Sequence, residues 1–163
     1  MKSASVANVL VDDGLRVAME QALSHADRAA QAGDVPVGAV ILDAEGQVIG
    51  EGWNTREGAD DPTGHAEIMA LRQAGEALGT WNLAGCTLVV TLEPCTMCAG
   101  AAVNARIARL VFGAWDQKAG ACGSVRDVVR DARLNHQIEV VPGVLEDRAR
   151  AQLEVFFAQK RES

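Results

Sequence analysis

One stretch of the sequence decides the fold: residues 86–113 read CTLVVTLEPCTMCAGAAVNARIARLVFG. Its first part, 86–92, is an apolar run rich in β-branched residues, which predicts a buried strand. Pro94 suits the first position of a helix, and the small residues that follow predict a helix ending near Ala105. A second apolar run, 110–113, predicts another strand. A strand, a helix and a strand in this order indicate a parallel strand pair with a crossover helix.

The apolar periodicity on either side of this unit predicts the other elements. Asp13 can cap a first helix that stops at Gly33, and a helix that stops at Gly79 is expected to turn Ile68, Leu71 and Leu78 inward. In chain order the expected elements are a helix from residue 13, strands over 37–42 and 47–53 in a hairpin, a loop over 54–64, a helix over 65–78, the unit above, a Gly-rich loop over 114–124, an edge strand over 138–141 and a closing helix over 145–161. The result is an α/β fold, a mixed sheet covered by helices.

Length and composition are typical of one compact domain. The chain has 163 residues, of which 48% are hydrophobic and 23% charged, and this excludes a disordered or collagen-like protein. We expect a single domain over residues 1–163, with 1–12 as a poorly ordered N-terminal extension. No stretch approaches the roughly 20 apolar residues of a membrane-spanning helix. The apolar run at 6–11 is short and is followed by acidic residues, so we expect no signal peptide and a cytoplasmic protein.

The formal net charge of -7 is unevenly distributed. Residues 1–64 carry the whole acidic excess, whereas residues 65–163 are balanced. Within the balanced part, residues 102–135 have a net charge of +3. A local basic region can face a polyanion even in an acidic protein, although taken alone this excess is typical of an ordinary solvated surface.

The four cysteines are Cys86, Cys95, Cys98 and Cys122. In a cytoplasmic chain of this size, a metal-binding or catalytic role is more common than a disulfide framework. Only Cys95 and Cys98 have the spacing of metal ligands, because residues three apart on a helix share one face. We expect Cys86 and Cys122 to be small buried residues.

His65 supplies a third ligand for a metal ion. His65 and Cys95 each open a predicted helix, where free backbone N–H groups favour the thiolate form of cysteine. One imidazole and two thiolates suit zinc, and the two thiolates cancel its charge. No fourth protein ligand has the expected spacing, and an open fourth position is typical of catalytic zinc. The sequence therefore predicts one catalytic zinc ion (Zn²⁺) held by His65, Cys95 and Cys98.

Glu67 lies two positions after His65. In the middle of a helix the two side chains would point to opposite sides, but in the first turn both can project past the helix end. Bound zinc lowers the pKa of its water to about 7, and a neighbouring carboxylate can take the proton and pass it on. Glu67 is therefore predicted to be the catalytic proton carrier.

Each of these residues alone has a simpler interpretation. A lone His65 would cap a helix, and the two cysteines alone would form a structural zinc knuckle, although a second ligand pair is missing. An acid in the first turn, such as Glu67, is favoured by the dipole of any helix, so this alternative stays open. These residues at these spacings arise by chance on the order of once in ten thousand chains, which favours the catalytic interpretation.

The spacing of these residues is the signature of zinc-dependent nucleobase deaminases. Beyond it, residues 15–160 resemble the bacterial tRNA-specific adenosine deaminases. The shared motifs are VPVGAV (35–40), GEGWN (50–54), DPTGHAEI (61–68), TLEPCTMCAGA (91–101), VFGA (111–114), DQKAGACGS (116–124) and LNH (134–136). The zinc motif identifies only the superfamily, whereas the 116–124 loop and the pair at 135–136 point to the tRNA enzymes.

The resemblance implies a three-layer α/β/α cytidine-deaminase-like fold with a central five-stranded mixed sheet, and a homodimer. It implies hydrolytic deamination of the wobble adenosine in the anticodon of an arginine tRNA to inosine, with attack of zinc-bound hydroxide at C6 of a flipped-out adenine. By motif position, Asn54 would bind the flipped base. Asp116, Lys118, Asn135 and His136 would lie near the RNA.

The sequence departs from the family pattern at Gly64, where alanine is expected, and at Trp115, where a smaller or basic residue is common. The nearest alternative is a free-base or nucleoside deaminase, for guanine or cytidine, on the same fold. The basic excess and the 116–124 loop favour RNA over a small metabolite. A zinc-stabilised nucleic-acid-binding module without turnover is the other alternative, and the incomplete ligand set and Glu67 speak against it.

Overall fold

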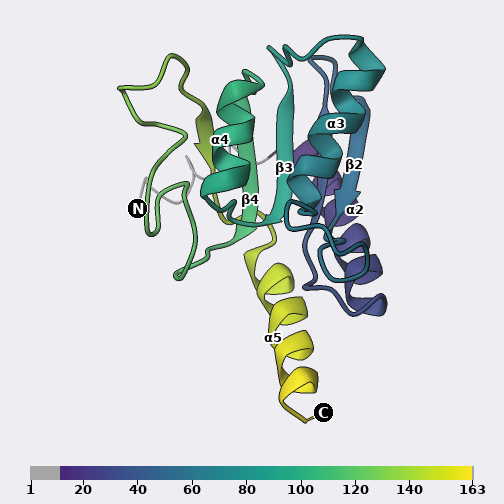
Figure 1. The fold of residues 1–163 in the computed structure, drawn as a ribbon. Coiled ribbons are helices and arrows are strands. Elements are labelled where there is room, and N and C mark those ends of the chain that lie inside the picture. The colour runs from purple at the N-terminus through teal and green to yellow at the C-terminus, as the bar shows by residue number, and fades with distance from the viewer. Residues whose placement is uncertain (1–11, 163) are drawn as a thin grey trace.

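The computed structural model describes residues 12–162. Its centre is a five-stranded sheet in the order β2-β1-β3-β4-β5 (Figure 1). The strands are β1 (Gly38–Leu42), β2 (Val48–Trp53), β3 (Thr87–Leu92), β4 (Arg109–Ala114) and β5 (Glu139–Val141). Strand β1 is antiparallel to both β2 and β3, whereas β3 and β4, and β4 and β5, pair in parallel. The predicted mixed sheet, with its hairpin and its parallel pair, is confirmed.

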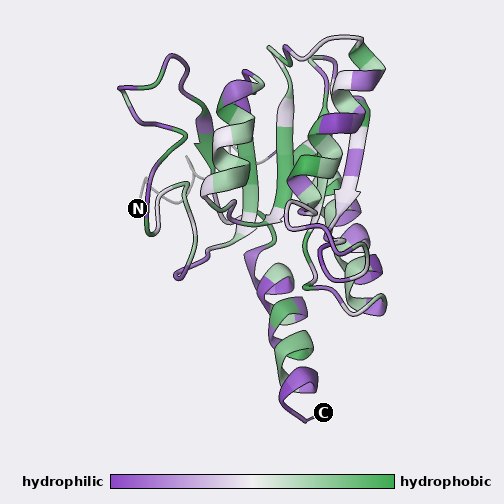
Figure 2. Ribbon diagram, viewed as in Figure 1, coloured by the Kyte–Doolittle hydropathy of each residue, from purple (hydrophilic) through white to green (hydrophobic). Residues whose placement is uncertain are grey.

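Helices cover both faces of the sheet, which gives the predicted α/β/α layers. The helices are α2 (Asp13–Gln31), α3 (Ala66–Leu78), α4 (Thr96–Asn104) and α5 (Glu146–Glu162). Strand β3 shows the division, since Leu88 and Val90 pack in the cluster with α3 and α4, whereas Val89 packs in the cluster with α2 and α5. Figure 1 shows α3 and α4 in front of the sheet, and Figure 2 shows that β3 and β4 are largely hydrophobic.

The inward face of α3 differs from the prediction. Leu78 is 44% exposed, and Ile68 and Leu71 are only half-buried. The buried residues of the helix are Ala66, Glu67, Ala70 and Ala74. The helix therefore buries its smallest side chains most deeply. Leu71 is partly buried and packs against the core cluster, whereas the expectation is wrong for Leu78, which is exposed.

Two glycines of β2 explain this close packing. A Cβ at Gly52 would collide with the carbonyl oxygen of Ala66, and one at Gly50 with the carbonyl oxygen of Ala70. The backbone of α3 thus lies directly on β2, and no space remains there for a large side chain. This contact fixes the start of α3, where His65 lies.

The residue that caps the first helix lies one position earlier than expected. The N-cap is Asp12, whose Oδ1 accepts a hydrogen bond of 2.8 Å from the backbone N–H of Leu15, so Asp13 is not the cap. The predicted N-terminal extension, apart from Asp12, lies outside the described residues, and the single deaminase domain over 1–163 stays a prediction. Within residues 12–162, no helix is both long and apolar enough to span a bilayer.

Candidate active site

The predicted metal ligands meet where α3 and α4 begin. His65 is the N-cap of α3, Cys95 is the N-cap of α4, and Cys98 lies in the first turn of α4. The Nδ1 atom of His65 lies 3.7 Å from Cys95 Sγ and 3.5 Å from Cys98 Sγ. Among the described residues, this is the one cluster of His, Cys, Asp and Glu side chains able to hold a metal ion.

One zinc ion fits between these three atoms. With Zn–S bonds of about 2.3 Å and a Zn–N bond of about 2.0 Å, tetrahedral zinc holds its nitrogen and sulfur ligand atoms about 3.5 Å apart. The observed separations of 3.5 and 3.7 Å agree with this value. Three protein ligands leave one tetrahedral position, which is the arrangement of catalytic zinc sites.

The ligand side chains shift one another's protonation. A hydrogen bond with Cys98 lowers the pKa of Cys95 to about 3, despite partial burial. A hydrogen bond with Cys95 raises the pKa of His65. The remaining cysteines, Cys86 and Cys122, are 2% and 0% exposed, and burial raises the pKa of both thiols. They are buried apolar groups outside the metal cluster, as predicted.

Glu67 faces the same pocket as two of the zinc ligands. The residue is 4% exposed, and burial raises the pKa of its carboxyl to about 7. It lines the pocket together with His65 and Cys95. His65 caps α3 and Glu67 lies in its first turn, so side chains two positions apart reach one site. This arrangement is the one predicted from the spacing of the two residues.

The pocket beside the metal cluster has a volume of 210 Å³. Besides Glu67, His65 and Cys95, its lining includes Asn54 and Arg56 from the loop after β2, and Asp116 from the loop after β4. Of the residues predicted to bind substrate, the pocket therefore contains Asn54 and Asp116.

The side chain of Asn54 has a fixed orientation. Its Oδ1 atom accepts a hydrogen bond of 3.0 Å from the backbone N–H of Ala66, at the start of α3. Because a backbone N–H can only donate, the side-chain oxygen must point to the start of α3. The amide NH2 group of Nδ2 must therefore occupy the other branch of the side chain. Asn54 thus offers hydrogen-bond donors to a ligand of the pocket.

Two buried carboxylates hold the loops that flank the pocket, and neither was assigned a role from the sequence. Asp34, 2% exposed, accepts hydrogen bonds from the backbone N–H groups of Glu57 and Gly58, at 2.8 and 3.1 Å. Glu93, also 2% exposed, accepts four hydrogen bonds from the 116–124 loop. The signal in the sequence is their position, since Asp34 directly precedes the VPVGAV motif and Glu93 lies within the TLEPCTMCAGA motif. An acid in a sequence, however, ordinarily indicates an exposed residue.

Asp116, which lines the pocket, also caps a turn, since its Oδ1 accepts hydrogen bonds from the backbone N–H groups of Lys118 and the following residue at 3.0 and 3.1 Å.

The other predicted RNA contacts, Lys118, Asn135 and His136, lie outside the pocket. Lys118 and Asn135 are exposed. His136 donates from Nε2 to the carbonyl oxygen of Ile107 at 2.7 Å, which ties the loop before β5 to the body of the protein. Their roles with RNA stay predictions.

The basic segment over 102–135 is partly neutralised. Arg130 pairs with Asp127 at 2.9 Å, and Arg133 pairs with Asp131 at 2.8 Å. These side chains are largely solvent-exposed, so the pairs contribute little to stability and can exchange for phosphate contacts. The segment keeps its net charge of +3 for an approaching polyanion.

Comparison with known proteins decides the family. The sequence model of the cytidine and deoxycytidylate deaminase zinc-binding region matches residues 12–114. The tRNA-specific adenosine deaminase of Haemophilus influenzae is 49% identical over 144 residues, which cover 88% of this chain and 83% of that protein. This chain belongs to the tRNA-specific adenosine deaminases.

Solved structures of deaminases confirm the fold. A structure from a study of A-to-I editing by tRNA:A34 deaminases matches with a TM-score of 0.80 and 43% identity, over 83% of this chain and 98% of the other. A guanine deaminase from Nitrosomonas europaea matches with a TM-score of 0.77 and 26% identity, over 88% of this chain and 84% of the other. The cytidine-deaminase-like architecture is thus shared by enzymes for different bases.

The match to the general deaminase region covers the metal centre and ends before the loop beside it. The general deaminase region contains all three zinc ligands and Glu67, and it ends at Ala114, directly before the 116–124 loop. The similarity to the tRNA-specific adenosine deaminase of H. influenzae is long enough that it must include this loop. The three zinc ligands and Glu67 therefore lie in the region that the deaminase superfamily shares.

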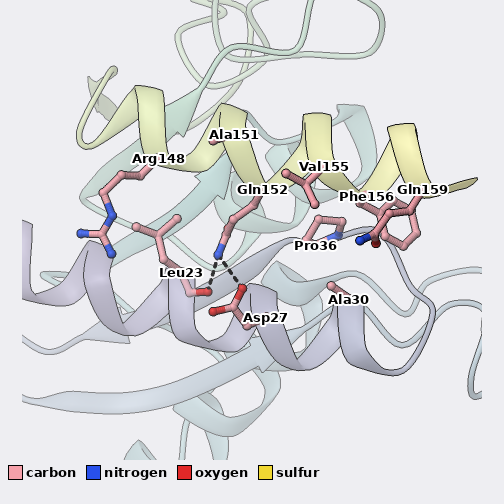
Figure 3. Close-up of a pocket in the computed structure, with 10 residues that line it drawn as sticks. All are labelled: Leu23, Asp27, Ala30, Pro36, Arg148, Ala151, Gln152, Val155, Phe156 and Gln159. Carbon is pink, nitrogen blue, oxygen red and sulfur yellow. Dashed lines mark hydrogen bonds between the residues drawn. The ribbon is translucent and has the colours of Figure 1, made fainter.

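A larger pocket, of 370 Å³, lies elsewhere between α2 and α5 (Figure 3). Gln152 crosses it and donates to the carbonyl oxygen of Leu23 and to Asp27, at 3.0 and 2.9 Å. Its lining residues include no cysteine or histidine. The smaller pocket, which is lined by Glu67 and by the metal ligands His65 and Cys95, is the candidate active site.

Proposed function

We propose that this protein deaminates adenosine to inosine at the wobble position of a tRNA anticodon, that of an arginine tRNA. The observation that carries the proposal is the buried Glu67, which lines one pocket with His65 and Cys95 of the His65–Cys95–Cys98 zinc centre, in a chain of the tRNA-specific adenosine deaminase family. The reaction consumes one water and releases one ammonia. It therefore needs an activated water, a proton carrier and a place for the base.

The protein supplies two of these three requirements directly. His65 would hold the zinc ion through Nδ1, and Cys95 and Cys98 through their Sγ atoms. Zinc, when bound, supplies a water acidic enough to act as nucleophile near neutral pH. The carboxylate of Glu67 would take a proton from the attacking water, pass it to N1 of the adenine and carry a second proton to the departing amino group. Its burial keeps bulk water from competing for these protons.

Asn54 binds the base in this proposal. Because its Oδ1 is held by the N–H of Ala66, its Nδ2 amine donates to an acceptor nitrogen of the purine ring. RNA is read mainly in single-stranded loops, whose bases can be splayed out into protein pockets. Asp116, at the pocket, and Lys118, Asn135 and His136, beyond it, are the proposed contacts to the nucleotides around the flipped adenine.

One assay tests the proposed function. Zinc-loaded protein is incubated with an anticodon stem-loop that carries a wobble adenine, and separately with guanine, cytidine and adenosine as free molecules. Inosine in the RNA, without turnover of the free compounds, is the expected result. The similarity to a guanine deaminase defines the competing outcome, since turnover of free guanine alone would assign the protein to that activity.

We also propose that the protein is a homodimer in the cytoplasm, where its tRNA substrate is found. A groove of 490 Å³ between α3 and α4 supports this, since its lining includes Ile68, Leu71 and Trp81, and Trp81 is 67% exposed. Apolar patches of this kind are typical of protein contacts. Light scattering should give twice the chain mass of 17.2 kDa for the wild type, and a lower mass for Trp81→Lys. A wild-type mass of one chain would overturn the dimer.

A further inference from the structure

Glu93 connects the zinc centre to the loop that forms one wall of the pocket. The residue follows β3 and precedes Pro94 and Cys95, so it lies two positions from a zinc ligand. Its backbone N–H donates to the carbonyl oxygen of Ala114 at 2.8 Å, which fixes the point where the 116–124 loop leaves β4. Its side chain is 2% exposed. The zinc mechanism above gives this buried acid no task.

The carboxylate of Glu93 gathers donors from both ends of the loop. Its Oε1 accepts from the backbone N–H of Asp116 at 3.0 Å. Its Oε2 accepts from the N–H groups of Cys122 and Ser124 at 3.0 and 3.1 Å, and lies 2.9 Å from the hydroxyl of Ser124. Only a carboxylate offers acceptors at both oxygens and no donor. The loop thus closes around a single side chain.

Two further contacts hold the loop against this acid. A Cβ at Gly120 would collide with the carboxyl carbon of Glu93 and with the hydroxyl of Ser124, so the loop backbone lies directly on the carboxylate. The backbone N–H of Ala121 donates to the carbonyl oxygen of Pro94 at 2.8 Å, one residue before the zinc ligand Cys95. The position of the loop is therefore set relative to the zinc centre.

We propose that Glu93 is a positioning residue for RNA: its carboxylate holds the 116–124 loop as the wall that receives the strand around the flipped adenine. The inference rests on the proposed function, because it assigns this wall to RNA. The wall places Asp116 and Ala119 in the pocket lining. Glu93 acts through the backbone of the loop and touches neither the base nor the zinc ion.

The substitution Glu93→Gln tests the proposal with nearly unchanged size. A glutamine has one acceptor oxygen, so its amine must face the N–H of Asp116 or those of Cys122 and Ser124. We expect the amides of these three residues to lose protection from hydrogen exchange, while those of β3 and α4 keep it. We expect KM for the stem-loop to rise about tenfold or more, kcat to change by less than about threefold, and zinc to remain at one per chain.

Ser124→Ala and Asp43→Asn complete the experiment. Ser124→Ala removes the hydroxyl that lies 2.9 Å from Glu93 Oε2 and 2.7 Å from the carbonyl oxygen of Asp116, and should shift KM and exchange in the same direction by a smaller factor. Asp43 also accepts two backbone hydrogen bonds, from Glu45 and Gln47, but in the turn between β1 and β2. Asp43→Asn should therefore leave KM for RNA unchanged. Ser124→Ala keeps the proposal testable even if Glu93→Gln fails to fold.

The outcomes separate this proposal from the proposed function. If wild-type protein does not deaminate the stem-loop, the proposed function fails, whatever the variants show. If the wild type is active but Glu93→Gln keeps its loop amides protected, or loses kcat at constant KM, Glu93 does not position the wall. Loss of zinc from Glu93→Gln would also overturn the proposal, because the acid would then act on the metal centre. An equal rise of KM in Asp43→Asn would show that the rise in Glu93→Gln reflects general destabilisation, and this would also overturn the proposal.

Discussion

The zinc centre and the 116–124 loop lie side by side, yet they are built in different ways. The centre consists of side chains at the starts of α3 and α4, and each ligand contributes one nitrogen or sulfur atom. The loop is shaped through its backbone, whose N–H groups converge on the carboxylate of Glu93. In the centre, the identity of each residue decides the chemistry. In the loop, one acid more than 20 residues earlier in the sequence holds the backbone of residues 116–124 in place.

This difference predicts which property each substitution changes. Replacement of a ligand or of Glu67 should abolish the metal site or the chemistry and leave RNA contacts intact. Replacement in the loops should change substrate preference and leave the zinc ion in place. The variants below test this division in order of decreasing effect.

Cys98→Ser should lose both zinc and stability. A serine hydroxyl is a poor, mostly protonated ligand, and the free energy of metal binding contributes to folding. Zinc content after dialysis against a chelator, and the melting temperature, measure the two effects. Cys86→Ser is the matched control, since Cys86 is equally buried but lies outside the metal cluster. It should lose some stability and keep one zinc per chain. A zinc-replete Cys98→Ser protein with wild-type melting would show that Cys98 is not a ligand.

Glu67→Ala should keep zinc and lose deamination. Without the carboxyl group, no positioned side chain moves protons to the ring and to the leaving amine, and loss of general acid–base catalysis costs about 10²–10⁴ in rate or more. Single-turnover deamination of the stem-loop measures the change. Glu76→Ala, an exposed acid on the same helix, should keep full activity. Near-normal turnover by zinc-replete Glu67→Ala would contradict the proposed role.

The same division decides how much the sequence could predict. His65, Glu67, Cys95 and Cys98 carry distinctive chemistry at fixed spacings along helices, so their site could be predicted from residue types and spacing alone. Glu93 could not be found in this way. Its importance lies in four donors from residues 116, 122 and 124, three of which are backbone N–H groups, and backbone donors leave no trace in residue types.

The fold shows the same limit. The strands, the β1–β2 hairpin, the parallel β3–β4 pair and the helix ends near Gly33 and Gly79 follow from local patterns, because periodicity and turn chemistry are local. The antiparallel pairing of β1 with β3 was not predicted from these patterns. The buried face of α3 does not follow from them either, because it depends on Gly50 and Gly52 of a neighbouring strand. Size alone favoured Leu78 as a core residue, and the close approach of the backbones left room only for alanine.

Asp116→Asn tests whether the loop distinguishes RNA from DNA. Asparagine can keep the two bonds that Oδ1 accepts, so the turn should survive and only the charge is removed. If the carboxylate accepts from a 2′-hydroxyl, a deoxyribose leaves it unpaired, at a cost of about 1–3 kcal/mol. The ratio of kcat/KM for RNA to that for DNA should then fall about tenfold. Asp131→Asn, which removes an exposed ion pair instead, should leave the ratio unchanged. An equal ratio in Asp116→Asn and wild type would make Asp116 a turn residue only.

Gly64→Ala, in the loop on the Asp34 side of the pocket, should have the smallest effect. An added Cβ would lie 3.0 Å from Thr55 Oγ1 and 3.1 Å from two backbone atoms of the same loop, so a shift of a few tenths of an ångström relieves each contact. Replacement of glycine also stabilises by about 0.4–1 kcal/mol through the unfolded chain, which offsets mild crowding. We expect zinc to be retained and the melting temperature to stay within about 2 °C. Gly120→Ala is the comparison. Its Cβ would collide with the carboxyl carbon of Glu93, and this side chain is buried and cannot move aside as an exposed loop can. Gly120→Ala should lower the melting temperature and raise KM for RNA, both by far more than Gly64→Ala does. Equal losses in the two variants would show that Asp34 holds its loop as rigidly with two hydrogen bonds as Glu93 does with four.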